Sequence, residues 1–128
     1  MRVAPLLLSL AGCSLLSPAP QDPETIRALL ELKPRIAAVY AGFKGPAVDP
    51  AGIAGVDRGL AALRDREAGK AGNEVMVGQI DRCLAMFRDH AAQRQAGTPW
   101  SAALHDNKLE NMLDLVDLAV ATERQKPL

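Results

Sequence analysis

The sequence predicts an all-α fold, a small up-down four-helix bundle. Apolar residues recur at spacings of three, four and seven, as along one face of a helix, and no useful stretch alternates in the manner of a strand. Four capping residues, three of them followed by proline at the first helical position, mark four helix starts. Because the connections are short, we expect consecutive helices to pack antiparallel.

The first helix is expected to open at Asp22-Pro23 and to end at Gly42 and Gly45. Pro34 lies inside it and should kink it, because proline lacks the amide that bonds to the preceding turn. Its apolar residues fall mostly on one face: Ile26, Leu29, Leu30, Leu32, Ile36, Val39, Tyr40 and Phe43.

The second helix is expected to open at Asp49-Pro50 and to end at Gly69 and Gly72. Its apolar residues form a narrow seam of Ile53, Val56, Leu60 and Leu63. Glycines 52, 55 and 59 each weaken a helix by roughly 1 kcal/mol relative to alanine. They favour either a close approach of a neighbouring helix or a mobile segment.

The third helix is expected to open at Asn73 and to end at Gly97, with an apolar stripe of Met76, Ile80, Cys83, Leu84, Phe87 and Ala91. The fourth is expected to open at Thr98-Pro99 and to run to Gln125. A break at residues 105–107 fits this long helix, because Asp106 or Asn107 can cap a new one.

Length and composition limit the classes of function. The chain has 128 residues, which is enough for one domain and one hydrophobic core. Its 15 basic and 15 acidic residues balance, so nothing favours general binding of nucleic acid. Aromatic residues make up only 3% of the chain, too few for a base-stacking platform.

The N-terminus fits the pattern of a cleaved export signal. Arg2 precedes an apolar run, Val3 to Leu10, that is shorter than the roughly 20 residues a bilayer span needs. The following Leu10-Ala11-Gly12-Cys13 resembles the lipobox of bacterial lipoproteins. The resemblance implies transfer of diacylglycerol to the Cys13 thiol, cleavage before Cys13 and acylation of the new amino group. Two or three acyl chains give stable anchoring.

The lipobox resemblance also implies an organisation and a location. Residues 1–12 would be the signal peptide, 13–21 the acylated cysteine with a short tether containing Pro18 and Pro20, and 22–126 the bundle. The implied location is the bacterial cell envelope. In the sorting rule of some Gram-negative bacteria, Ser14 favours the outer membrane, with the bundle facing the periplasm.

The residues that could bind a metal are few. Cys83 and His90 lie seven residues apart on the third helix, and with His105 and Asp106 they form a weak candidate site. Haem held by a methionine and one of the histidines is a further weak candidate, and no cofactor is assigned. The competing interpretations are a buried Cys83, a cysteine that pairs between molecules or is reactive, a His90 at the edge of the apolar stripe, and a His105 at the surface or at a helix break.

The sequence favours a protein without enzymatic activity. No motif for a nucleophile, a phosphate loop or a di-iron centre is present, and Glu110, Asp114 and Asp117 are expected on a solvated face. Trp100, beside a helix start, is a candidate interaction residue or a cap on one end of the core. The predicted function is therefore docking or assisted assembly of an envelope protein partner. A helper of the pilotin kind and an immunity or exclusion lipoprotein are both compatible, and a bundle that binds a metal, haem or small apolar ligand is the alternative.

Overall fold

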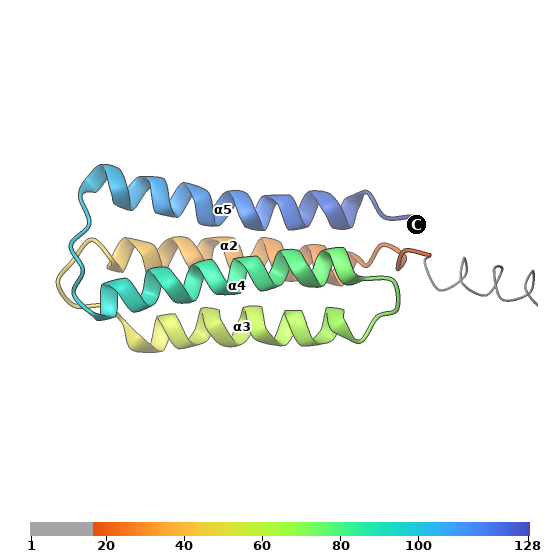
Figure 1. Cartoon of the computed structure of the whole chain (residues 1–128), viewed down its shortest axis with the longest axis horizontal. Helices are drawn as coiled ribbons and strands as arrows, with labels where there is room; N and C mark the ends of the chain where they lie inside the picture. The colour runs from red at the N-terminus through yellow and green to blue at the C-terminus, as the bar shows by residue number, and fades with distance from the viewer. Residues whose placement is uncertain (1–16) are drawn as a thin grey trace, which may run out of the picture.

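The computed structural model describes residues 17–128, so the lipobox and Cys13 lie outside the described residues. Its helices form an up-down bundle in which each helix packs against two neighbours in a closed square (Figure 1). The predicted four-helix fold is confirmed. The helices are α2 (Pro23–Gly42), α3 (Pro50–Ala68), α4 (Glu74–Gln95) and α5 (Ala102–Arg124).

Three of the described helix starts have a side-chain cap, and two of these caps are at the predicted residue. The carboxylate of Asp22 accepts from the amide of Glu24 at 2.9 Å, and Asp49 accepts from the amide of Ala51 at 3.1 Å. Asn73 precedes α4 but makes no capping bond, because its side-chain amide donates instead to the carbonyl of Glu67 at 3.0 Å. The third side-chain cap is on α5.

The prediction for the start of α5 was wrong by three residues. Ser101, and not Thr98, caps this helix, and its hydroxyl accepts from the amide of Leu104 at 3.1 Å. The segment before it is held by α4, because the Thr98 amide donates to the carbonyl of Gln93 at 2.9 Å. Pro99 therefore lies before the helix and is not its first residue.

The expected break at residues 105–107 is also wrong, because α5 runs without interruption from Ala102 to Arg124. The amide of His105 donates to the carbonyl of Ser101 at 2.9 Å, as in a regular helical turn. The His105 side chain is 3% exposed and packs inside the bundle, so no new helix start is needed there.

The glycines of α3 allow a close approach to α2. A Cβ atom on Gly59 would lie 3.0 Å from Leu32 Cδ2, and one on Gly55 would lie 3.3 Å from the guanidinium of Arg35. Both contacts are tighter than ordinary packing, so the glycines serve the helix contact, the first of the two interpretations above. The predicted seam of α3 is buried.

The core runs the length of the bundle and ends in an aromatic cluster. The chain has one tryptophan, one tyrosine and two phenylalanines, and all of them meet near the loops α2–α3 and α4–α5. Cys83 is completely buried, as the core interpretation predicts. Among residues 17–128 no helix has the length and apolar character that crossing a membrane requires.

Candidate functional site

The N-terminal segment is fixed to one end of the bundle. Figure 1 shows that the first described residues, the loop between α3 and α4 and the C-terminus lie at this same end, which we call the N-terminal end. Ala19 is 3% exposed, and its amide donates to the carbonyl of Gly72 at 3.1 Å. The amide of Gln21 donates to the carbonyl of Pro127 at 2.7 Å. The last residues of the expected tether are therefore packed on the bundle.

Gly72 makes this attachment possible. Its φ angle of 72° is in the region that favours glycine. A Cβ atom at this position would lie 2.0 Å from the carbonyl oxygen of Ser17, so no side chain fits there. The sequence predicts Gly72 as a helix terminator, but its contact with Ser17 and Ala19 is a tertiary feature that the pattern does not contain.

A network of charges with two buried carboxylates, Glu67 and Glu123, lies at the same end. Glu67 is 0% exposed, accepts a bond of 3.0 Å from the Thr25 hydroxyl and lies 2.7 Å from Lys70 Nζ. Lys70 also bonds to the carboxylate of Asp22 at 2.7 Å, which joins the end of α3 to the start of α2. Arg66 adds a second cation to Asp22 at 2.5 Å.

Glu123 makes the equivalent contacts at the end of α5. It is 0% exposed, accepts from the Asp22 amide at 2.9 Å and pairs with Lys126 Nζ at 2.7 Å. Lys126 also donates to the side-chain oxygen of Asn73, whose amide bonds to Glu67. The network is therefore continuous across the end of the bundle, and each buried carboxylate has a lysine three residues later.

Sequence reasoning missed both buried glutamates, although one signal was available. The spacing Glu-x-x-Lys occurs at the ends of two helices, at 67 with 70 and at 123 with 126. The sequence alone gives no sign that both ends meet the start of α2.

The network shifts the protonation of its members. Hydrogen bonds from Lys70 and then Arg66 hold the pKa of Asp22 well below its usual range, although burial acts in the opposite direction. Burial lowers the pKa of Lys70, but its bonds to Asp22 and Glu67 outweigh burial and raise it. Lys70 and Asp22 are therefore both charged at neutral pH, and their ion pair joins the end of α3 to the start of α2.

At the opposite end, two histidines bond to Tyr40. The Tyr40 hydroxyl and His90 Nδ1 are hydrogen-bonded at 2.7 Å, and His105 Nε2 donates to the Tyr40 carbonyl at 2.5 Å. His105 Nδ1 faces the carboxylate of Asp106 at 3.1 Å. His90 is 5% exposed, so the interpretations that placed His90 at an edge and His105 at the surface or at a helix break were wrong. Both predictions failed for the same reason: Tyr40, at the end of α2, is hydrogen-bonded to His90 of α4 and to His105 of α5.

Trp100 closes this end of the core. Its ring is half-buried and packs edge-on against Phe43 and His90, with centroids 5.7 and 5.6 Å away. Its indole nitrogen donates to the side chain of Gln93 at 3.0 Å. The cationic groups of Arg94 and Lys108 lie 5.6 and 5.2 Å from the ring centroid.

Burial is the largest influence on the pKa values of His90, Tyr40 and Cys83. Burial, and then the nearby Lys108, lower the pKa of His90, while Asp89 acts in the opposite direction. Burial raises the pKa of Tyr40 above its usual range, so the hydroxyl stays protonated. Burial likewise raises the pKa of the Cys83 thiol to about 11, which leaves it as a thiol at neutral pH.

The structure does not assemble the candidate metal ligands into a site. Within the described part of the chain, no group of three or more His, Cys, Asp or Glu residues is placed to hold a metal ion. His90 and His105 direct ring nitrogens at Tyr40, and Cys83 is a buried free thiol.

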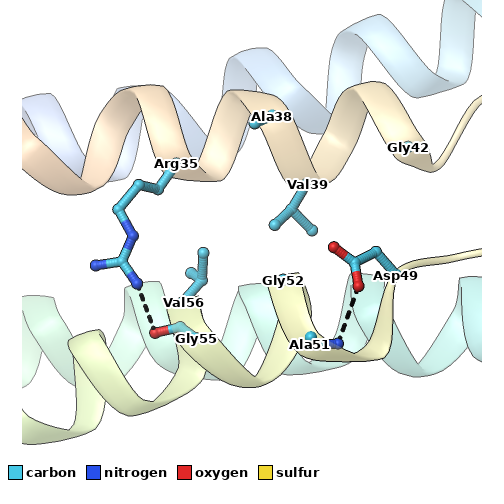
Figure 2. A pocket seen from close by; sticks show the side chains of 9 residues that line it. All are labelled: Arg35, Ala38, Val39, Gly42, Asp49, Ala51, Gly52, Gly55 and Val56. Carbon is cyan, nitrogen blue, oxygen red and sulfur yellow. Dashed lines mark hydrogen bonds between the residues drawn. The ribbon is translucent and has the colours of Figure 1, made fainter.

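A shallow pocket of about 290 Å³ lies between α2 and α3 (Figure 2). Ala38 and Gly42 line it from α2, and Gly52 and Gly55 line it from α3. Arg35 crosses the space between the helices and donates to the carbonyl of Gly55 at 3.1 Å. The pocket follows from the small residues of the helix contact and offers no set of polar groups for catalysis.

No protein-family model, no curated protein and no solved structure matches the chain.

Proposed function

We propose that the chain is a lipid-anchored protein of the bacterial cell envelope whose helical bundle docks another envelope protein and has no enzymatic activity. The membrane is its first partner, through acylated Cys13, and an envelope protein is the second. The outer membrane, with the bundle in the periplasm, is the location that Ser14 favours under the sorting rule given above.

The observation that carries this proposal is the attachment of residues 19–22 to the bundle. Ala19 is buried, Gln21 bonds to the C-terminal segment, and Asp22 joins the charged network. An acyl group on Cys13 would lie only six residues before Ala19. Anchoring would therefore hold the whole bundle close to the membrane.

The absence of a catalytic arrangement in residues 17–128 is consistent with docking. Several groups whose pKa values are shifted have structural roles. Asp22 pairs with two cations, Tyr40 is hydrogen-bonded to His90, and Cys83 is buried in the core. A ligand inside the bundle has less support, because His90 and His105 each use a ring nitrogen in a hydrogen bond to Tyr40.

The test compares three full-length proteins, the wild type, Cys13→Ala and Cys83→Ala, in a bacterial host fed a palmitate analogue that can be labelled. We expect label and membrane association in the wild type and in Cys83→Ala and neither in Cys13→Ala. Cys83→Ala is the matched control, since it removes the other of the two cysteines. Cross-linked envelopes are then purified through a tag after the exposed Leu128.

Each part of the proposal has its own contradictory result. Membrane retention of unlabelled Cys13→Ala would overturn the anchor. An acylated wild type that is recovered alone after cross-linking would overturn docking. A stoichiometric partner recovered with the wild type and Cys83→Ala, and lost with Cys13→Ala, is the expected outcome.

A further inference from the structure

One outer groove of the bundle combines an apolar floor with an acidic rim. It lies between α2 and α5 and has a volume of about 410 Å³. Leu109 and Leu113 line it and also pack against the core. The acidic residues that line it are all exposed and follow α5 for about three turns: Asp106, Glu110, Asp114 and Asp117.

The groove has a strong excess of negative charge. Lys33 is its one lining cation and pairs with Asp117 at 2.6 Å. Asp106 lies 3.1 Å from Nδ1 of the His105 ring. Within residues 17–128, Glu110 and Asp114 make no ion pair.

Two other grooves of the bundle are neutralised or crossed by their own side chains. Between α3 and α4, Arg64 pairs with Asp81 at 2.9 Å, and Arg88 pairs with Asp57 at 2.7 Å. Between α2 and α3, the guanidinium of Arg35 spans the pocket. The groove between α2 and α5 therefore differs from these two grooves in its unbalanced charge.

We infer that this groove binds a basic amphipathic helix of the partner protein. Leucine or similar side chains on one face of that helix would cover Leu109 and Leu113, and flanking lysines or arginines would face Glu110 and Asp114. Charge complementarity selects this occupant over an acidic helix, which the rim repels. The inference rests on the docking part of the proposed function and names the chemistry of the partner.

The probe is a synthetic amphipathic peptide of about fourteen residues, or nearly four helical turns, with leucines on one face and lysines on the others. A second peptide carries glutamates in place of the lysines. Binding of fluorescent peptide is measured by anisotropy with the full-length chain in a neutral detergent. All variants share the detergent, so peptide bound by micelles is common to every measurement.

Two double variants distinguish binding in this groove from a general effect of the protein's negative charge. Glu110→Lys with Asp114→Lys should weaken binding of the lysine peptide at least about tenfold, since each change replaces an attraction by a repulsion. Glu31→Lys with Asp65→Lys is the matched control: it makes the same change in net charge at exposed positions outside the groove and should leave affinity within about twofold.

Further variants test the floor and the sign of the charge effect. Leu113→Gln should also weaken binding, because it removes apolar contact without changing charge. Lys33→Ala should strengthen binding, because it frees Asp117. Equal losses in both double variants, tighter binding of the glutamate peptide, or unchanged binding by Leu113→Gln would overturn the inference. These results do not depend on acylation of Cys13, so failure of the groove and failure of the anchor are distinguishable.

Discussion

Replacement of Gly72 by alanine should release the N-terminal segment from the bundle. The φ angle of 72° costs an alanine about 1–2 kcal/mol. The new Cβ atom would in addition meet the Ser17 carbonyl oxygen at 2.0 Å, a distance that no packing permits. The segment must then move and lose the bond from the Ala19 amide, which contributes about 0.5–1.5 kcal/mol, and the burial of the Ala19 methyl group, about 0.8 kcal/mol.

Gly97→Ala is the matched control for this prediction. Its φ angle of 79° imposes a similar backbone cost, but no atom lies within 4 Å of the added Cβ. We therefore expect Gly72→Ala to lower the free energy of unfolding by about 1–2 kcal/mol more than Gly97→Ala does. Urea unfolding followed by circular dichroism measures this difference.

Amide hydrogen exchange measures the effect of the same substitution at a single residue, Ala19. Exchange of the Ala19 amide should accelerate in Gly72→Ala and stay at the wild-type rate in Gly97→Ala, because only the first variant breaks its bond to residue 72. Equal losses of stability in both variants, together with unchanged exchange at Ala19, would refute the reasoning that attaches the segment to the bundle.

Two more predictions concern the core and the aromatic end. Phe87→Ala should lower the free energy of unfolding by about 3–5 kcal/mol, because its ring is completely buried, whereas Val75→Ala, at a position 68% exposed, should change it by less than about 0.5 kcal/mol. A loss below about 1 kcal/mol for Phe87→Ala in the same urea assay would mean that α4 does not pack as described. The pKa of His90 is lowered in the folded chain, so the unfolded chain binds more protons just below its own pKa of about 6.5. Stability should fall as pH drops through this region, and His90→Gln should remove that part of the dependence in urea unfolding at pH 5 to 8; an identical pH dependence in the variant would contradict the buried position of His90.

The helices were predictable because their signals are local. Asp22 and Asp49 cap the helices that they precede, and Gly69 follows the last residue of α3. The start of α5 was misplaced because α4 decides it: Gln93 bonds to both the Thr98 amide and the Trp100 indole. These contacts join α4 to the segment before α5, and the residue pattern of neither segment indicates them.

The buried charges could be predicted only in part. Glu67 and Glu123 are of a residue type that is almost never fully buried without a partner. Their lysine partners follow in sequence, but the third participant is the start of α2, which reaches them only through the topology of the bundle. The burial of His105 was likewise not predictable from its neighbours in sequence. His105 lies in a polar stretch, but its ring is buried and bonds to the carbonyl of Tyr40, 65 residues away.

The proposed anchor and the proposed groove together would set geometric limits on the partner. Ala19 is six positions after Cys13, so the end of the bundle would lie within about 20 Å of an acylated Cys13, even for an extended chain. Asp117 and Asp106 lie seven and 18 residues before the end of α5 at Arg124, which places the acidic rim about 10 to 27 Å along the bundle from that end. A docked helix would therefore lie no more than about 50 Å from the membrane. The proposed partner segment is consequently a basic helix in the membrane-proximal part of an envelope protein, because one held further away would not reach the groove.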